Sequence, residues 1–130
     1  MTYQWLDRRL LVLLHDESLA SHGGSSGLRD AGLLDSALAR PANLLAYAEP
    51  GQPDLADLAA SYAFGLAKNH PFVDGNKRAA FLSVGLFLGL NGQRLTASQA
   101  EATVAVFGLA AGEIDEPNFA AWLRDHTAPR

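Results

Sequence analysis

The sequence contains no cysteine and no long apolar run. Without cysteine there can be no disulfide, no thiolate nucleophile and no cysteine-ligated metal, and the composition fits a reducing compartment such as the cytoplasm. We expect no membrane span, because no run of about eighteen apolar residues is present. The short apolar stretch LLVLL near the N-terminus follows Asp7, Arg8 and Arg9 and precedes His15. This pattern favours a helix of the mature domain over a signal peptide.

Positive charge is also scarce. Lysine and arginine together number 10 against 14 acidic residues, which gives a formal net charge of −4. A surface that binds duplex nucleic acid normally carries a basic excess, so we expect no direct nucleic-acid partner. Apolar residues make up 48% and charged residues 18%, which excludes the disordered class. The length fits a single domain over residues 1–130.

Helical periodicity dominates what is present. Leucines at helical spacing predict a first helix over roughly residues 4–20, followed by a loop in the glycine- and serine-rich stretch SHGGSSGLRDAG. A second helix covers LLDSALARP and should stop at Pro41, which lacks an N–H and clashes with the preceding turn. Pro50, Gly51 and Pro53 make the next break.

The second half of the chain continues the helical pattern. Asp54 is placed to cap a third helix over LADLAASYAFGLAKN, and a fourth runs from about Gly75 to Leu90. A capping box, Thr96 with Gln99 or Ser98 with Glu101, opens a fifth helix that ends near residue 111, and EPNFAAWLRDH forms a sixth. We therefore expect an all-α bundle of about six helices. The fourth helix, apolar nearly all round, should be its central buried helix.

The stretch AKNHPFVDGNKRAAF, residues 67–81, concentrates polar residues between these two helices. The third helix must end before Pro71, because the residue before a proline is displaced from the helical region. His70 is thereby left in the connection, and Asp74, Gly75 and Asn76 form the next helix start. The N-terminus of a helix presents unpaired N–H groups and a partial positive charge, which together form an anion site.

Two cations in the first turn of the fourth helix, Lys77 and Arg78, oppose the helix dipole unless an anion is bound there. A phosphate would satisfy both, and Arg78 could grip it through two N–H bonds. Asp74 would repel that phosphate unless Mg²⁺ bridged the two. Histidine exchanges protons near neutral pH, so His70 is suited to accept a proton from a hydroxyl. Together, these residues are suited to transferring part of a nucleotide to a hydroxyl group.

The same residues resemble a known family. HPFVDGNKR is similar to the Fic signature, and its lysine version resembles the Doc branch, the toxins of Phd–Doc toxin–antitoxin modules. The flanking stretches LLHDESLASHGG, GLRDAGLLDSALARP, GLFLGLNGQRL and GLAAGEI are similar to further parts of Doc-like toxins, in the same order.

The resemblance implies a role for each motif residue. His70 would be the general base toward a hydroxyl of a target protein, and Asp74 would hold Mg²⁺. Gly75, Asn76 and Lys77 would belong to the anion-binding turn, and Arg78 would contact the phosphates of ATP. Pro71 and Phe72 would shape the loop without taking part in the chemistry, with Phe72 packing inward.

Lys77 separates two possible reactions. Fic enzymes that transfer AMP resemble this pattern with glycine at that position, whereas in Doc the nucleotide binds reversed and presents its γ-phosphate. The resemblance therefore implies a protein kinase that phosphorylates a serine or threonine of the translation machinery, elongation factor Tu, and so inhibits translation. An AMP transferase and a non-catalytic binding module remain as alternatives.

Each of these residues also has a simpler interpretation. Alone, His70 would be a helix-end histidine, Asp74 a plain helix cap, and Lys77 with Arg78 a solvated face. His15 and His22 are expected to be structural or exposed, and His126 to lie in a frayed tail. The glycine loop lacks the Lys-Ser/Thr of a P-loop and is expected to be a connection near the flap that aligns the target peptide.

Self-inhibited Fic proteins carry a Ser/Thr-x-x-x-Glu-Gly/Asn helix, and no such stretch occurs in this sequence. A chain with this active site and no built-in inhibitor would be toxic, so the resemblance implies an antitoxin from a separate, Phd-like chain. A segment of that antitoxin would fold into a groove of the toxin. The apolar surface near the early loop and the second helix is the expected groove.

Overall fold

The computed structural model describes residues 2–48 and 53–130, and within them helices dominate. The expected all-α bundle is confirmed, with Pro50 and Gly51 of the expected break outside the described residues. The helices are α1 (Arg8–His22), α2 (Ala31–Tyr47), α3 (Leu55–Asn69), α4 (Asn76–Leu90), α5 (Gln99–Ala111) and α6 (Glu116–Asp125). Two short strands, β1 (Gln93–Leu95) and β2 (Thr127–Pro129), complete the fold.

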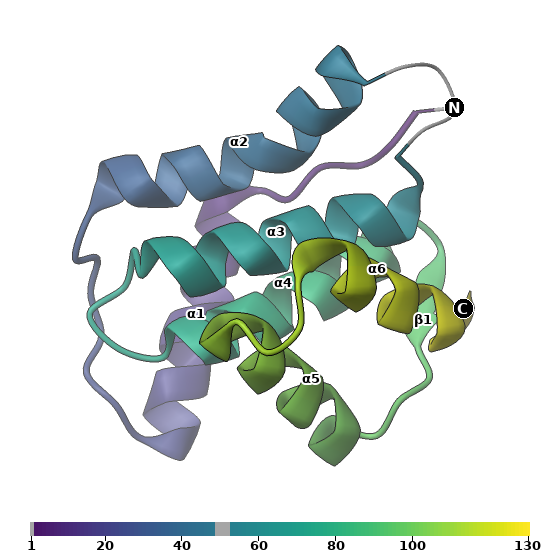
Figure 1. The fold of residues 1–130 in the computed structure, drawn as a ribbon. Helices are drawn as coiled ribbons and strands as arrows, with labels where there is room; N and C mark the ends of the chain where they lie inside the picture. The colour runs from purple at the N-terminus through teal and green to yellow at the C-terminus, as the bar shows by residue number, and fades with distance from the viewer. Residues whose placement is uncertain (1, 49–52) are drawn as a thin grey trace.

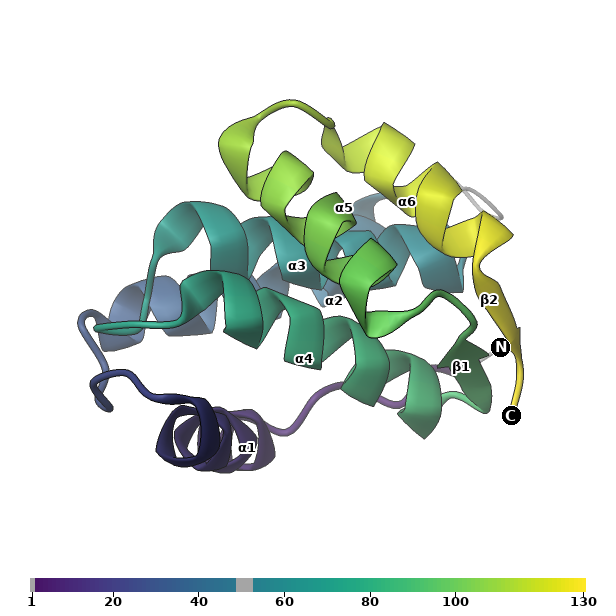
Figure 2. The ribbon, with the colours of Figure 1, turned by 90° about the horizontal axis from the view of Figure 1, so that it is seen from below.

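The helices lie in layers around α3 and α4. α3 contacts α2, α4, α5 and α6, whereas α4 contacts α1, α3 and α5. Seen from below, α1 lies on one side of α4, and α5 and α6 lie on the other (Figure 2). α2 runs alongside α3 (Figure 1). The connection between α3 and α4, which carries the motif, is therefore held at one end of the central pair of helices.

Side-chain caps fix most helix starts, including those expected at Asp54 and Ser98. Each of these two forms a complete capping box, with Asp57 and Glu101 respectively. α1 begins at Arg8 and not near residue 4, because Asp7 caps it by accepting a hydrogen bond from the backbone N–H of Arg9.

The expected stop of the second helix at Pro41 is wrong. α2 continues through this proline to Tyr47, and Pro41 itself is buried. An internal proline costs a helix about 3 kcal/mol, through the lost hydrogen bond and the ring clash. Leu45, one turn further on, packs against the core, and its burial offsets part of that cost. In Figure 1 the last turns of α2 bend away from α3, as expected for a proline kink.

The most deeply buried helix is α3 and not α4. Ten residues of α3 are buried, against six of α4. The reason is the row of small residues in α3, which lets neighbouring helices approach closely. A Cβ added at Gly65, for example, would lie 2.9 Å from Cδ of Arg40 and 3.1 Å from Cα of Ala37 in α2. α4 leaves one side partly open to solvent, with Leu90 at 41% exposure.

The C-terminal segment is paired and not frayed. β2 pairs antiparallel with β1, with Arg94 opposite Ala128. His126 caps the C-terminal end of α6, and its Nδ1–H donates to the carbonyl oxygen of Trp122 at 2.7 Å, which corrects its expected place in a frayed tail. None of the helices in the described part of the chain has the length and apolar character needed to cross a membrane.

Candidate active site at the start of α4

The first turn of α4 is open at its N-terminal end. Gly75 precedes it in the left-handed region, with φ of 74°, and no side chain of the described part of the chain caps the helix. Within the described residues, no protein acceptor is found for the backbone N–H groups of Asn76, Lys77 and Arg78. Three unpaired N–H groups at a positive helix end form an anion site.

The side chain of Asn76 holds the loop and does not face the anion site. Its Oδ1 accepts a hydrogen bond from the backbone N–H of Phe72 at 2.9 Å, and its Nδ2 donates to the Phe72 carbonyl at 3.0 Å. Phe72 is buried, at 2% exposure, and the neighbouring Pro71 is buried as well. The expected inward packing of Phe72 is confirmed. Asn76 contributes to the anion site through its backbone N–H.

His70 ends α3 in an uncommon conformation. Its φ of 50° and ψ of 54° make it the one non-glycine residue with positive φ in the described part of the chain. Such a conformation costs free energy in a non-glycine residue and is found often at functional sites. The side chain is exposed, and no hydrogen-bond partner for its ring is found among the described residues. The ring is therefore available to a ligand.

Arg29, from the glycine loop, fastens this end of α3. Its Nε donates to the carbonyl oxygen of His70 at 2.6 Å, and its Nη2 donates to that of Asn69 at 2.8 Å. The backbone N–H groups of Arg29 and Asp30 both donate to the carbonyl of Pro71. The loop thus satisfies three carbonyl groups at and after the helix end, which stabilises the left-handed turn at His70.

Asp74 lies exposed beside the anion site. Its Oδ1 accepts a hydrogen bond from the backbone N–H of Gly75 at 2.8 Å, and its Oδ2 accepts one from that of Ser25 at 3.2 Å. No group of three or more histidine, cysteine or acidic side chains that could hold a metal is found in residues 2–48 and 53–130. One exposed carboxylate fits Mg²⁺, which binds through one or two carboxylates and is completed by water and phosphate oxygens.

A buried histidine of α1, His15, contacts the backbone of Asp74. His15 is fully buried, and its Nε2 lies 2.9 Å from the carbonyl oxygen of Asp74. Because a carbonyl can only accept, Nε2 must carry the proton. The ring packs against that of Phe72, with centroids 4.1 Å apart. The structural role expected for His15 is confirmed, whereas His22 is exposed.

The two cations of the first turn point in different directions. Arg78 donates from Nε to Oγ of Ser18 at 3.0 Å, and its guanidinium lies 5.3 Å from the ring centroid of Phe81. The Nζ of Lys77 lies 4.9 Å from the ring centroid of Phe107 in α5. Arg78 is thus held in place from one edge, while Lys77 reaches across to the neighbouring helix.

These side chains line one pocket of about 530 Å³. Six of the eight expected site residues line it, namely His70, Asp74, Gly75, Asn76, Lys77 and Arg78. The other two, Pro71 and Phe72, lie buried in the loop behind it. The opposite wall comes from α5 and includes Phe107, which the sequence pattern did not mark.

The glycine loop lies against the motif. Leu28 forms an isolated antiparallel bridge with Phe72, and the backbone N–H of Val73 donates to the carbonyl of Gly27 at 3.0 Å. The sequence did not mark Arg29 or His15 as part of the site. Their contacts join residues 41 and 59 positions apart, and no local pattern encodes them.

The sequence matches a known family over the part of the chain that carries this site. The model of the Fic/DOC family matches residues 5–88, which include α1 to α3, most of α4 and the whole motif. The chain is 37% identical over 114 residues to a protein kinase doc of Escherichia phage P1, covering 88% of each chain. It is 47% identical over 75 residues to a toxin Doc of Mycolicibacterium smegmatis, covering 58% of this chain and 57% of that protein.

Proposed function

The chain belongs to the Fic/Doc family, and from this premise we propose that it is a nucleotide-dependent protein kinase that acts as the toxin of a toxin–antitoxin module. Its relatives support a toxin of such a module. The observation that carries the enzymatic part is the juxtaposition of His70 with the uncapped start of α4 in one pocket. Within residues 2–48 and 53–130, neither the imidazole nor the three N–H groups beside it have a hydrogen-bond partner, and this arrangement suits proton transfer next to a bound phosphate.

The proposed reaction is phosphoryl transfer from ATP to a serine or threonine hydroxyl. The hydroxyl oxygen forms a bond to the γ-phosphorus, and the bond from that phosphorus to the β–γ bridging oxygen breaks. His70 accepts the hydroxyl proton, and ADP leaves with the electron pair. The N–H groups of Asn76 and Lys77 and the guanidinium of Arg78 hold the phosphate oxygens. Positioning and charge neutralisation supply most of the catalysis in such transfers.

Asp74 would hold Mg²⁺, which supplies neutralisation of phosphate charge when it is bound. The carboxylate is exposed and lines the same pocket as His70 and Arg78. His15 and Ser25 position it through the Asp74 carbonyl and carboxylate respectively. The family's AMP-transferring members resemble this pattern with glycine at position 77, and we therefore assign γ-phosphoryl transfer to this chain, which has lysine there.

The proposed target is elongation factor Tu, and the proposed antitoxin is a Phd-like segment of a separate chain. Leu28 of the early loop, at 38% exposure, is an exposed apolar side chain that suits such a segment, whereas Leu44 of α2, at 39%, lies in a separate hollow shared with Pro117 of α6. An apolar groove that accepts an amphipathic helix is a common mode of peptide recognition.

The test uses ATP labelled at either the α- or the γ-phosphate. The purified chain is incubated with Mg²⁺, elongation factor Tu and each label, and the target is then analysed for retained label. We expect γ label alone on the target, and none with His70→Ala. Retained α label would establish an AMP transferase. Growth inhibition by a folded His70→Ala variant would instead indicate a non-catalytic binding protein.

A further inference from the structure

The wall of the pocket that faces the start of α4 is apolar and comes from α5. Val106 and Phe107 line it together with Phe81 of α4. Phe107 is unusual among them because its ring is 52% exposed, in a chain whose other phenylalanines are buried or partly buried. An exposed aromatic ring at the mouth of a mixed polar and apolar pocket is a candidate contact for a ligand.

The position of Lys77 shows how far the Phe107 ring lies from the first turn of α4, where the phosphates would bind. Lys77 belongs to the first turn of α4, and its Nζ lies 4.9 Å from the ring centroid of Phe107. The Lys77 side chain plus one van der Waals contact therefore spans the distance from the first turn of α4 to the Phe107 ring. In a nucleotide, the base is separated from its phosphates by a single ribose, a comparable span. A nucleotide with its phosphates on the turn can thus bring its base to the α5 wall.

We propose that the ring of Phe107 stacks on the base of the bound nucleotide, which makes the α5 wall the base subsite of this pocket. This inference rests on the proposed function, since it requires a nucleotide on the turn. Aromatic side chains bind bases through their faces, and every base has such a face.

Lys77 can contact either the base subsite or the phosphates of the bound nucleotide. Its ammonium lies over the Phe107 ring, an arrangement of modest strength at an exposed site. A phosphate oxygen is a stronger partner for an ammonium, and the lysine stem is flexible. On nucleotide binding, Lys77 moves from the ring to the phosphates and leaves a ring face open to the base.

The α5 wall offers few hydrogen-bonding groups that could recognise the edge of a base. The Thr103 hydroxyl, beside Phe107, donates its proton to the carbonyl of Gln99 at 2.8 Å and keeps only acceptor capacity. The Asn76 amide is engaged with Phe72. A lone acceptor does not distinguish adenine from guanine, because both carry N–H donors. The subsite should therefore take either purine, and pyrimidines less well because they stack over a smaller area.

Calorimetric titration with Mg²⁺ present tests this proposal. The probes are ATP, GTP, CTP and inorganic tripolyphosphate, and the proteins are the wild type, Phe107→Ala, Phe107→Trp and Val104→Ala. Val104 is the matched control, since it lies on α5 with 73% exposure and lines an adjoining hollow but not the pocket itself.

We expect Phe107→Ala to raise the Kd of ATP about tenfold, which corresponds to about 1.4 kcal/mol, and to leave the Kd of tripolyphosphate unchanged. Phe107→Trp should retain binding, Val104→Ala should match the wild type, and ATP and GTP should bind within about threefold of each other. An unchanged Kd of ATP in Phe107→Ala, or an equal loss for tripolyphosphate, would overturn the stacking role. So would a preference above tenfold between ATP and GTP.

The failure of this inference is distinct from failure of the proposed function. If ATP binds and the target is phosphorylated while Phe107→Ala binds ATP normally, only the base subsite is wrong. If wild-type protein binds neither ATP nor tripolyphosphate, the nucleotide site itself is wrong. Loss of target or antitoxin binding in Phe107→Ala with an unchanged Kd of ATP would assign the ring to a protein partner instead.

Discussion

The guanidinium of Arg29 is bonded to the carbonyl oxygen of His70, with Nε and O 2.6 Å apart. His70 carries the imidazole that we propose as the general base, and its backbone is in the left-handed region. A second bond joins Arg29 Nη2 to the Asn69 carbonyl at 2.8 Å. Arg29 thus stabilises the strained backbone at His70, whose side chain lines the pocket. Arg29 is not among the residues that line that pocket.

Replacing Arg29 by alanine should slow target phosphorylation more than it destabilises the fold. The left-handed turn at His70 loses two hydrogen bonds, and small displacements of a reacting group cost rate steeply. We expect a rate on the order of tenfold lower, with a loss of about 1 kcal/mol or less in the free energy of unfolding. Initial rates and denaturant unfolding measure the two effects.

The control for this experiment is Arg8→Ala. Arg8 is also an exposed arginine, and it forms an ion pair with Asp35 at 2.8 Å on a part of the chain that does not line the pocket. Its loss should leave the rate unchanged. Equal rates for Arg29→Ala and Arg8→Ala would show that the clamp on His70 is irrelevant to catalysis.

Gly75 should not tolerate a side chain. Its φ is 74°, and a Cβ there would lie 2.8 Å from Cε1 of the buried His15. Gly75→Ala should therefore lower the free energy of unfolding by about 1–2 kcal/mol and displace the anion-binding turn. Gly85, in the same domain and within α4, has open space around its Cα.

The matched substitution Gly85→Ala should stabilise the protein by about 0.5–1 kcal/mol, because alanine favours a helix interior. Denaturant unfolding of the two variants gives both values. Equal effects at the two glycines would contradict the crowding at Gly75.

Local signals in the sequence accounted for the helix boundaries around the motif. Asp54 and Ser98 cap the helices expected of them, and Pro71 ends α3 at the preceding residue. The open helix start after Asp74 follows from Gly75 in the same way. These features depend on neighbours within a few residues, so the sequence displays them directly.

Long-range packing accounted for the features that the sequence did not reveal. α2 continues through Pro41, where burial of Pro41 and Leu45 offsets part of the local cost, and no local sequence pattern reports burial. No sequence pattern marks Phe107, yet it lies half-exposed in the pocket wall. β1 and β2 are three residues each and pair across more than thirty positions, too short for a periodic signal.

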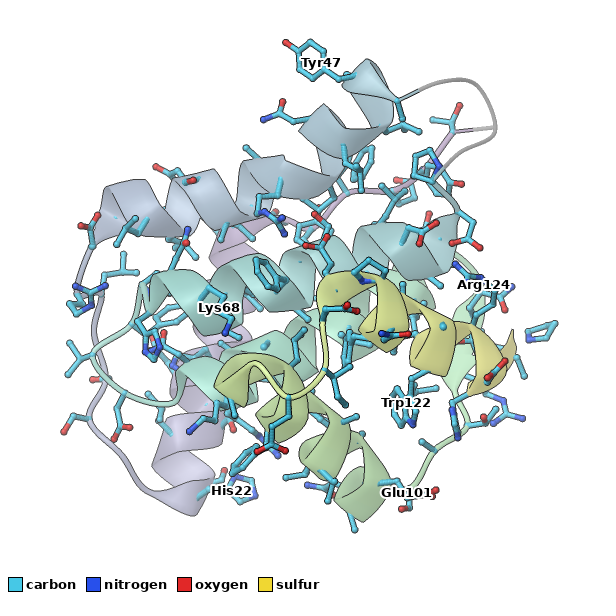
Figure 3. All side chains as sticks on the ribbon, viewed as in Figure 1. His22, Tyr47, Lys68, Glu101, Trp122 and Arg124 are labelled. Atoms are coloured by element: carbon cyan, nitrogen blue, oxygen red, sulfur yellow. The ribbon has the colours of Figure 1, made fainter. Side chains whose placement is uncertain are left out.

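The ion pair of Asp54 with Arg124 should make stability depend on pH in the acid range. Figure 3 shows Arg124 near the start of α3, and its Nε lies 2.7 Å from Oδ2 of Asp54. Hydrogen bonding to Arg124 lowers the pKa of Asp54 from 3.8 to about 2, despite the opposing effect of burial. Burial raises the pKa of the neighbouring Asp57 and partly offsets this.

A lowered pKa in the folded state means that Asp54 stabilises the fold above pH 3.8 and loses that contribution as the pH falls toward 2. Arg124→Met should remove most of this dependence. Thermal midpoints between pH 5 and pH 2 test the prediction on both proteins, with acid-stable buffers at constant ionic strength. We expect a shallower decline for the variant; parallel curves would contradict the assigned cause.

Asp74→Asn should weaken the dependence of nucleotide binding on Mg²⁺ far more than it weakens the fold. The side chain is exposed, and its amide oxygen can still accept one of the two backbone hydrogen bonds. We expect Mg²⁺ to tighten ATP binding in the wild type and to have little effect in the variant, with thermal midpoints within a few degrees. A strong Mg²⁺ response in Asp74→Asn would place the ion elsewhere.

The most direct test of a polyphosphate site at the start of α4 is the response of its backbone amides. Amide chemical shifts are recorded in a titration of the protein with Mg²⁺ and a non-hydrolysable ATP analogue. The account predicts the largest shifts at Asn76, Lys77 and Arg78, whose N–H groups have no acceptor within the described residues. Saturable shifts confined to other elements, with these three amides unmoved, would contradict it.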